Sequence, residues 1–410
     1  MRVFDVAIVG GGMVGASCAL ALAGSGRSVV LIEGVAQDSA AQPSFDERTT
    51  ALGNASRRIF EGLGVWERMQ PQAAAIRAIH VSEAGRFGFA RLNAAAQGIE
   101  AFGYVVANRV IGEALWSALA HAALVSVRVP ARPQTVEIAP DAVTLTIEDA
   151  VGARERLQAR LVVAADGAHS LVRAAAGIEA EVEDYGQIAL VVNARADRPH
   201  DGTAFERFTS AGPLAVLPLW DGSFTVVWTV APEQAAHLLA VDDAAFLEEL
   251  QSSFGWRAGC FVRVGRRASY ALKLTRAAAS VALRTALIGN AAQALHPVAG
   301  QGFNLGLRDA AALAELIAAG GADPGAAALL GEFAAWRASD RRGVIRFTDG
   351  LIKLFGDGRA SVAVLRNLGL LLFDLVPPAK RALARVSAGF GGPTPRLARG
   401  LLLPAERTRG

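Results

Sequence analysis

Three glycine-rich segments contain the residues whose types and spacing could do chemistry. The first, Gly10–Gly15, has the pattern G-x-G-x-x-G between an apolar strand-like run and a helical run. Gly10 permits a tight turn, Gly12 lets a pyrophosphate approach the backbone, and Gly15 lets the helix pack closely. Glu33 ends the next apolar run, where a carboxylate can bind ribose hydroxyls. These residues predict binding of FAD or NAD and disfavour a cofactor with a 2′-phosphate.

The other two segments follow buried-strand patterns further along the chain. Asp166 and Gly167 come directly after the apolar run 161–165, and open α/β sheets bind ligands at the carboxyl ends of their strands. The third segment begins with Gly289 and Asn290. It continues to the start of a helical pattern with five further candidate residues, Gly300, Gln301, Gly302, Phe303 and Asn304. A positive helix end with free N–H groups would stabilise an anionic reduced flavin there.

The elements that must position these segments suggest an α/β protein. Val3–Val9, Ala16–Ala23 and Ser28–Ile32 have the pattern of a strand-helix-strand unit, and the chain from about 336 onward has a helical pattern. We therefore expect a Rossmann-like domain for FAD or NAD, an inserted, mainly antiparallel β-sheet domain, and a helical C-terminal region. The Rossmann-like domain comprises residues 1–75, 96–184 and 275–345, the inserted sheet domain 76–95 and 185–274, and the C-terminal region 346–410.

Composition excludes several functions. The 410 residues are 52% hydrophobic and 19% charged, which favours a large folded core over disorder. The 41 basic and 38 acidic residues nearly cancel, and no basic cluster is interleaved with aromatic residues, so we expect no nucleic acid partner. No Gly-Lys pair occurs, which excludes a phosphate-binding P-loop. The two cysteines and six histidines lack metal-ligand spacing, so we expect no metal and a reducing compartment.

Taken together, the three segments resemble the class A FAD-dependent aromatic monooxygenases, and the resemblance covers the chain from end to end. It implies that the Rossmann-like domain is an FAD-binding domain and that the inserted sheet domain binds substrate. It also implies that Arg48 and Arg109 contact the flavin. Within this family the chain is similar to the ubiquinone-biosynthesis hydroxylases, closest to the 2-polyprenyl-6-methoxyphenol hydroxylase group, through motifs such as Phe205–Thr209. It departs from the family at Asn290, where Asp is usual, and at Gln293, where His is common.

The resemblance implies a reaction. NADH or NADPH reduces FAD, O2 reacts with the reduced flavin, and the resulting C4a-hydroperoxide hydroxylates a polyprenyl-methoxyphenol ring. We expect that ring between the flavin and the strands of residues 185–230. The candidate wall residues, which could equally be ordinary core, are Leu214, Val216, Leu217, Pro218 and Trp228. No catalytic base is predicted, because a phenol activates its own ring. His296 and Pro297 are the candidates near the flavin, and Pro297 is also a predicted cofactor contact. His296 is the residue to test, with a structural hydrogen bond as the alternative role.

A polyprenyl substrate resides in the bilayer, so a route to the membrane surface is needed. The charge-free run 6–26 contains too many glycines for a signal peptide or a membrane span, so we expect a cytoplasmic protein. The apolar run 368–376, followed by Lys380, Arg381 and Arg385, predicts an interfacial segment that binds peripherally at the inner face of the membrane. The alternative is a helix packed on the FAD-binding domain.

Three other functions remain open at this point. A sister hydroxylase could act at another ring position, because the flavin motifs carry no information on regiochemistry. An FAD-dependent isoprenoid reductase or epoxidase shares the glycine-rich turn. A non-catalytic flavin-binding subunit could serve an assembly of ubiquinone-biosynthesis proteins, which are candidate partners in either case. The loop Gly300–Gly302 argues against this last function, because a scaffold does not need to hold the flavin ring.

Overall fold

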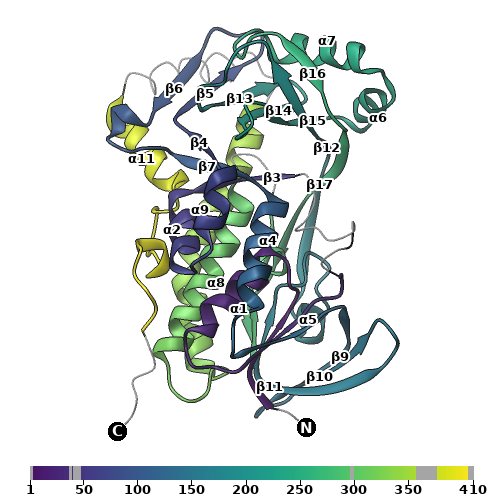
Figure 1. Ribbon diagram of the computed structural model, residues 1–410, viewed down its shortest axis with the longest axis vertical. Coiled ribbons are helices and arrows are strands. Elements are labelled where there is room, and N and C mark those ends of the chain that lie inside the picture. The colour runs from purple at the N-terminus through teal and green to yellow at the C-terminus, as the bar shows by residue number, and fades with distance from the viewer. Residues whose placement is uncertain (1–2, 37–38, 40–47, 296–299, 357–375, 405–410) are drawn as a thin grey trace.

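A mostly parallel sheet forms one end of the molecule (Figure 1). The computed structural model describes residues 3–36, 39, 48–295, 300–356 and 376–404. The sheet has the order β18 (Val281–Ala282), β19 (Thr285–Leu287), β11 (Arg154–Ala164), β1 (Val3–Val9), β2 (Val29–Ile32) and β8 (Val125–Arg128). The strands from β19 to β8 run parallel. Parallel strands need cover on both faces, which explains their continuous apolar sequences.

Helices cover one face of this sheet, and an antiparallel extension packs on the other. The covering helices are α1 (Met13–Ala23), α4 (Asn108–Leu119), α8 (Gln301–Ala319) and α9 (Ala327–Gly356). Their shared core includes Ile8, Leu22, Leu115 and Leu313, all fully buried. On the opposite face a second core joins the sheet to β9 (Ala131–Ile138) and β10 (Val143–Asp149). The carboxyl ends of β1, β2 and β11 are thus held on a rigid base.

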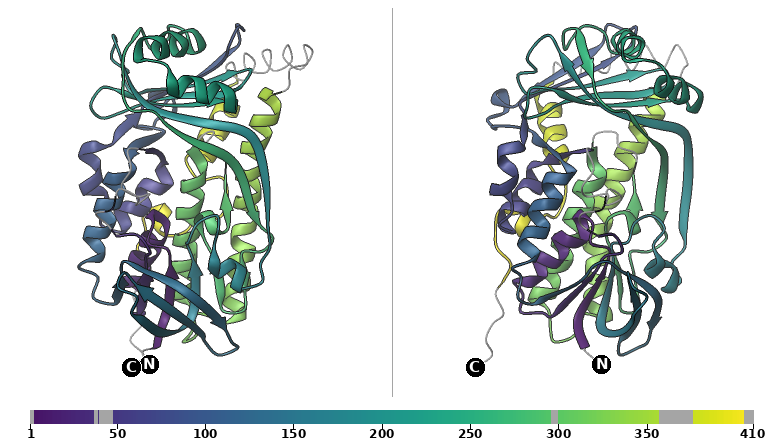
Figure 2. Two further views of the ribbon diagram at one scale, coloured as in Figure 1. Left: turned by 90° about the vertical axis from the view of Figure 1, so that its right-hand side faces the viewer. Right: turned by 45° about the vertical axis from the view of Figure 1, so that its right-hand side comes forward.

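A nine-stranded sheet lies at the other end, and α8 and α9 lie between the two (Figure 1). Its order is β20 (Gln293–Ala294), β17 (Ala268–Ala277), β12 (Ala180–Ala196), β15 (Phe224–Val230), β14 (Gly212–Pro218), β13 (Thr203–Thr209), β5 (Ala78–Glu83) and β6 (Phe89–Asn93), and β16 (Phe261–Val264) pairs with β12. Only the pair β13 and β5 is parallel among the pairs described. The long strands β12 and β17 extend from this sheet toward the parallel sheet (Figure 2).

The remaining elements connect or cover these sheets. A small sheet has the order β3 (Thr49–Gly53), β7 (Gly103–Ala107) and β4 (Ala74–Ile76). The other helices are α2 (Asn54–Gly62), α3 (Trp66–Met69), α5 (Leu171–Ala175), α6 (Pro232–Ala240), α7 (Asp243–Phe254) and α11 (Pro377–Ser387), and 3-10 turns include η2 (Gln70–Gln72), η3 (Ala95–Gln97), η4 (Gly289–Ala291) and η6 (Leu397–Arg399).

The architecture confirms the predicted fold class, a Rossmann-like part, a mainly antiparallel sheet and a helical C-terminal region. The exact domain boundaries stay a prediction. The proposed interfacial run 368–376 lies outside the described residues except for Val376, which is exposed. Within the described ranges, no helix has the length and apolar character needed to cross a bilayer.

Candidate FAD and substrate site

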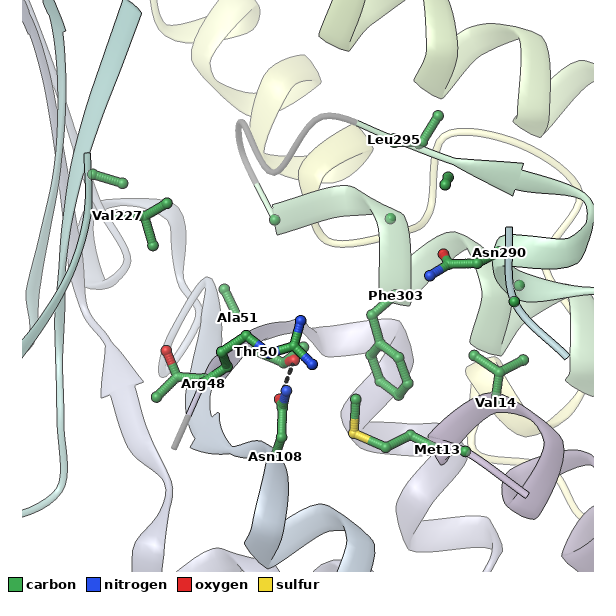
Figure 3. Close-up of a pocket in the computed structure, with 18 of the residues that line it drawn as sticks. Met13, Val14, Arg48, Thr50, Ala51, Asn108, Val227, Asn290, Leu295 and Phe303 are labelled. Carbon is green, nitrogen blue, oxygen red and sulfur yellow. Dashed lines mark hydrogen bonds between the residues drawn. The ribbon is translucent and has the colours of Figure 1, made fainter. Parts of the chain in front are cut away.

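A single cavity of about 1400 Å³ extends from the three glycine-rich segments to the nine-stranded sheet. Ligand pockets commonly have about 300–1,000 Å³, so this cavity has room for a large cofactor and a second molecule. Figure 3 shows residues of the glycine-rich side, such as Asn290 and Phe303, opposite Val227 of the sheet. The site therefore combines a cofactor side and a sheet side in one space.

The first glycine-rich turn brings backbone atoms closer together than side chains would allow. Gly10 has φ of +101°, and a Cβ on it would lie 2.3 Å from the carbonyl oxygen of Ala165. A Cβ on Gly15 would lie 1.9 Å from the oxygen of Gly10. Helix α1 follows with Gly12 as its N-cap and without a side-chain capping bond. Its first N–H groups can therefore hold an anionic phosphate, while Gly15 serves helix packing and does not line the cavity.

Glu33 lies at the carboxyl end of β2, lines the cavity and is 8% exposed. Its Oε2 accepts a hydrogen bond from Gly11 N at 2.6 Å, and its Oε1 accepts one from Val35 N at 2.8 Å. These bonds fix the carboxylate next to the glycine-rich turn. Each carboxylate oxygen retains a second acceptor position, so the group can also bind hydroxyls.

Asp166 follows β11 and reaches the same cavity together with Gly167. Its Oδ2 accepts hydrogen bonds from Leu171 N at 2.9 Å and Val172 N at 3.3 Å. Its Oδ1 is buried without a hydrogen-bond partner among the described residues. Burial raises the pKa of this carboxyl above its ordinary value, although hydrogen bonds from Ser170 and the backbone oppose the shift. Such an unsatisfied buried acceptor indicates that a ligand donates to it.

An arginine side chain links the third glycine-rich segment, which begins at Gly289, to the segment that follows Asp166. Arg173 donates to the carbonyl oxygen of Ala291 at 2.9 Å and to that of Ala168 at 2.7 Å. Asn290 is exposed to the cavity, in keeping with its predicted contact with the cofactor. Helix α8 then begins at Gln301, four residues before Leu305, where the helical pattern of the sequence predicts its start. Its N-cap Gly300 has no side-chain capping bond. Gly300, Gly302 and Phe303 line the cavity, so the N-terminus of this long helix faces it.

Several predicted cofactor contacts have other roles. The side chain of Asn304 makes four hydrogen bonds, from Gly53 N and Ser56 Oγ to its Oδ1, and from its Nδ2 to Ala51 O and Gly300 O. All its capacity is used, so Asn304 holds α8 to β3 and α2 instead of lining the cavity. Gln301 is buried and also absent from the cavity wall.

The two predicted arginines differ. Arg48 lines the cavity, and its guanidinium lies 4.8 Å from the centroid of the Tyr270 ring. Arg109 does not line it and instead contacts Gln72 at 3.2 Å and Glu113 at 3.8 Å. Its neighbour Asn108 lines the cavity and accepts a bond from Thr50 Oγ1 at 2.8 Å, drawn in Figure 3. Sequence reasoning missed Asn108 because only the arginine resembled a family position.

Only one of the five predicted substrate-wall residues lines the cavity. Leu217 lines the cavity, together with Ala215 of the same strand and Val227 of β15. Successive side chains of a strand point to opposite faces. The other four predicted wall residues are therefore buried on the opposite face of the sheet. Leu214, Val216 and Trp228 belong to a core that includes α6 and α7, and Pro218 is buried on the same face. The other two candidates, His296 and Pro297, lie outside the described residues.

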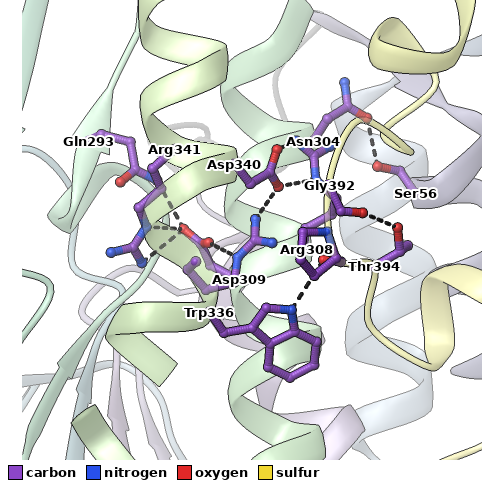
Figure 4. Close-up of polar contacts among 12 residues, drawn as sticks. Ser56, Gln293, Asn304, Arg308, Asp309, Trp336, Asp340, Arg341, Gly392 and Thr394 are labelled. Atoms are coloured by element: carbon purple, nitrogen blue, oxygen red, sulfur yellow. Dashed lines mark hydrogen bonds and ion pairs between the residues drawn. The ribbon is translucent and has the colours of Figure 1, made fainter. Parts of the chain in front are cut away.

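A buried ionic cluster supports the site from behind (Figure 4). Asp309 of α8 accepts from Arg337 Nε at 2.7 Å, from Arg341 at 3.1 Å and from Gln293 Nε2 at 3.0 Å. Asp340 of α9 accepts from Arg308 Nε at 2.8 Å and also pairs with Arg337. The cluster joins α8, α9 and the segment after Asn290. It thereby holds Gln293 and α9 against α8, whose N-terminus faces the cavity.

The residues present fit FAD. Two helix N-termini without capping side chains face the cavity, the backbone cradle excludes side chains, and Asp166 has a free acceptor. Glu33 carries the acceptor expected for a ribose. No group of three or more acidic, histidine or cysteine side chains suited to a metal ion occurs within the described ranges.

Comparison with known proteins agrees with this fit. The family model described as FAD binding domain matches residues 3–348. The chain is 39% identical to a Rhodospirillum rubrum protein named ubiquinone hydroxylase UbiL, over 98% of this chain and 94% of that protein. It is 31% identical to 3-demethoxyubiquinol 3-hydroxylase of Escherichia coli, over 94% of this chain and 98% of that protein.

Solved structures agree on the fold. The crystal structure of p-nitrophenol 4-monooxygenase PnpA from Pseudomonas putida DLL-E4 matches with a TM-score of 0.79 at 20% identity, and the match covers 96% of this chain and 99% of that chain. The PqsL structure from P. aeruginosa in complex with 2-aminobenzoylacetate matches with a TM-score of 0.74 at 22% identity, covering 90% and 100%. The chain therefore belongs to the FAD-binding family of FAD-dependent aromatic monooxygenases.

Proposed function

We propose that this chain uses NADH or NADPH and O2 to hydroxylate a polyprenyl-methoxyphenol ring in ubiquinone biosynthesis. One observation carries the proposal, the single cavity that joins the FAD-binding segments to an apolar sheet face. A ring held between them is within reach of the cofactor. The similarity to the ubiquinone hydroxylases over nearly the full length of both chains supports this substrate class.

The chain's own residues would bind FAD, orient the substrate ring and shield both from water. The chemistry that bound FAD supplies is transfer of electrons from NAD(P)H to O2 and of one oxygen atom to the ring. We assign the adenosine end to Gly10, Gly12, Glu33 and Asp166, and the flavin end to Arg48, Asn290 and the N-terminus of α8. On the sheet side, Ala204, Ala215, Leu217 and Val227 line the cavity and would exclude water from the ring.

A further apolar part of the cavity supports a prenyl substituent. It lies between the sheet and the helices α9 and α11, with the lining residues Phe347, Leu351, Leu354, Phe355 and Ala384. Phe208 of β13 stacks on Phe355 of α9 with 3.5 Å between ring centroids. Apolar side chains that line a cavity favour an apolar ligand segment. We assign the polyprenyl tail to this part.

Membrane contact belongs to the same proposal. A substrate with a long apolar tail would reach the enzyme from a bilayer, and α11 carries Lys380, Arg381 and Arg385 near the tail-binding part. We propose a cytoplasmic protein that binds the membrane surface peripherally, where other proteins of the pathway are candidate partners. Vesicle flotation tests this point, because equal recovery of the full chain and of a chain lacking residues 351–410 would contradict it.

The experiment that tests the function uses the purified protein with bound FAD and a short-chain 2-polyprenyl-6-methoxyphenol. We expect substrate to stimulate NAD(P)H oxidation and, under ¹⁸O2, to yield a product that contains one labelled oxygen atom. NMR of the product then distinguishes this enzyme from a sister hydroxylase that acts at another ring position. Bound FAD without an oxygenated product would contradict the proposal and favour the non-catalytic subunit.

A further inference from the structure

One acidic side chain interrupts the apolar face that the nine-stranded sheet presents to the cavity. Glu206 of β13 pairs with Val81 of β5 on one side and with Ala215 of β14 on the other, and Ala215 pairs with Val227 of β15. These four residues form one row across four strands, and all four line the cavity. Figure 3 shows the end of this row, where Val227 faces the cofactor side.

The other residues that the central strands add to this face are apolar. They are Ile79 of β5, Ala90 and Leu92 of β6, Ala204 and Phe208 of β13 and Leu217 of β14, and Phe205 of β13 also borders the cavity. The remaining charged or titratable lining residues are Glu33, Arg48, Arg132, Asp166 and His169, and none belongs to these strands. Within the described part of the chain, Glu206 is thus the one charged group that the sheet contributes to the cavity wall.

In the described part of the chain, no hydrogen bond or opposite charge compensates for the burial of the Glu206 carboxyl. Its Oε1 is buried, with no hydrogen-bond partner among the described residues. Burial raises the pKa of Glu206 to about 7, and burial is the sole cause of the shift. Its neighbour Arg207 points to the opposite face, where its Nε donates to the carbonyl oxygen of Ser253 at 3.0 Å. A buried acceptor without a partner destabilises the protein. A ligand that donates a hydrogen bond to it would remove this cost and bind more tightly.

A phenolic hydroxyl fits this position. It donates one hydrogen bond from the edge of a planar ring whose faces suit apolar walls, whereas a methoxy group or a prenyl chain has no donor. We propose that Glu206 accepts a hydrogen bond from the phenolic hydroxyl of the ring substrate and thereby selects which ring carbon faces the flavin. This inference rests on the proposed function, and it identifies the substituent that the site recognises.

The test compares a short-chain 2-polyprenyl-6-methoxyphenol with its phenol O-methyl ether, which has nearly the same shape but no hydroxyl donor. Both are titrated into the FAD-loaded protein, and binding is followed by the change in the flavin spectrum. For the unsubstituted chain we expect the phenol to bind about tenfold or more tightly than the ether. The Glu206→Leu variant should lose this preference. Glu206→Gln, which retains an acceptor oxygen, should keep part of it.

The control is Glu181→Gln, an acid of the same sheet whose side chain is 76% exposed, and it should keep the full preference. FAD content and the thermal midpoint show whether each variant is folded, and Glu206→Gln decides if Glu206→Leu does not fold. An undiminished preference in a folded Glu206 variant, or no preference in the unsubstituted chain, would overturn the inference. Product formation by the unsubstituted chain is scored separately. A preference for the phenol without any hydroxylated product would count against the proposed function alone.

Discussion

Two buried carboxyl groups, Asp309 behind the cavity and Glu206 in its wall, show opposite solutions to the same problem. Asp309 is fully buried and accepts from Arg337, Arg341 and Gln293. Burial raises its pKa, but the two guanidinium groups and their hydrogen bonds outweigh burial, so its pKa lies below the ordinary value. Glu206 has no such partners among the residues that the structure describes, and burial raises its pKa to about 7.

This difference between Asp309 and Glu206 distinguishes a carboxyl group with a structural role from one that can recognise a ligand. A carboxylate whose hydrogen-bond and ion-pair partners all come from the chain helps to hold the fold together, and it has few acceptor positions left for a ligand. A carboxyl group that borders a cavity without a partner weakens the fold and can gain from a ligand. The four predictions below test this distinction, from the largest expected effect to the smallest.

Breaking the compensated site should have the largest effect. Asp309→Asn leaves the buried guanidinium groups of Arg337 and Arg341 without their counter-charge. Removing one partner of a buried ion pair commonly costs about 3–5 kcal/mol. We expect the free energy of unfolding, measured with chemical denaturant on the FAD-loaded protein, to fall by about that amount. A loss below about 1 kcal/mol would show that the cluster contributes little to stability.

The burial of Glu206 should make the free energy of unfolding fall as the pH rises. The pKa of Glu206 is raised from 4.5 to about 7, so the folded state holds a proton that the unfolded state has released. Stability from this group is complete below about pH 4.5 and is lost as pH rises through about 7. Glu206→Gln should therefore be more stable than the unsubstituted chain by about 1–3 kcal/mol at pH 8, and the gain should be smaller at pH 4.5.

Denaturation curves at the two pH values test this prediction. Glu33, Arg48, Arg132, Asp166 and His169, the other charged or titratable lining residues, are present in both proteins, so the difference between them reports Glu206. A gain that does not vary with pH would show that Glu206 does not titrate in this range.

Ligand binding should stabilise the unsubstituted chain more than the Glu206 variant. At ten times its Kd, a ligand stabilises a folded protein by about 1.4 kcal/mol. At the same phenol concentration, Glu206→Leu with a tenfold weaker affinity should gain only about 0.4 kcal/mol. Thermal unfolding with and without phenol measures this difference. Equal gains in the two proteins would contradict a role of Glu206 in binding.

Substitution of an exposed acidic residue should have the smallest effect on the free energy of unfolding. Glu181 of β12 pairs with Arg276 of β17 at 2.5 Å, with both side chains at least half exposed. Exposed ion pairs contribute about 0–1 kcal/mol. Glu181→Gln should therefore change the free energy of unfolding by less than about 1 kcal/mol, as measured by the same denaturation experiment. A loss as large as that for Asp309→Asn would refute burial as the cause of the ranking.

Local patterns predicted one strand and several residues that line the glycine-rich side of the cavity. The strand Val3–Val9 was predicted with its observed bounds, and Gly10, Glu33, Asp166 and Asn290 all line the cavity. These features are set by neighbouring residues, such as a glycine turn directly after an apolar strand. The start of α8 was placed four residues late, because Gln301 and Gly302 have no apolar helical pattern.

Long-range packing accounts for what the sequence did not reveal. Strand β14 is apolar on both faces, so alternation alone could not show that Leu217, and not Leu214 or Val216, faces the cavity. The partners of Asp309 come from α9 (Arg337 and Arg341) and from β20 (Gln293), and no local signal connects them. Glu206 was recognised within a family motif, but its missing partner became visible only when the sheet register placed it on the cavity face.

The crystal structure of the FAD-loaded protein with a short-chain phenol tests the account most directly. We predict the adenosine end of FAD at Glu33 and Asp166, and the ring between the flavin and the row of Val81, Glu206, Ala215 and Val227. The phenolic oxygen should lie within hydrogen-bond distance of the Glu206 carboxyl. A ring bound elsewhere, or one whose hydroxyl faces away from Glu206, would contradict the account.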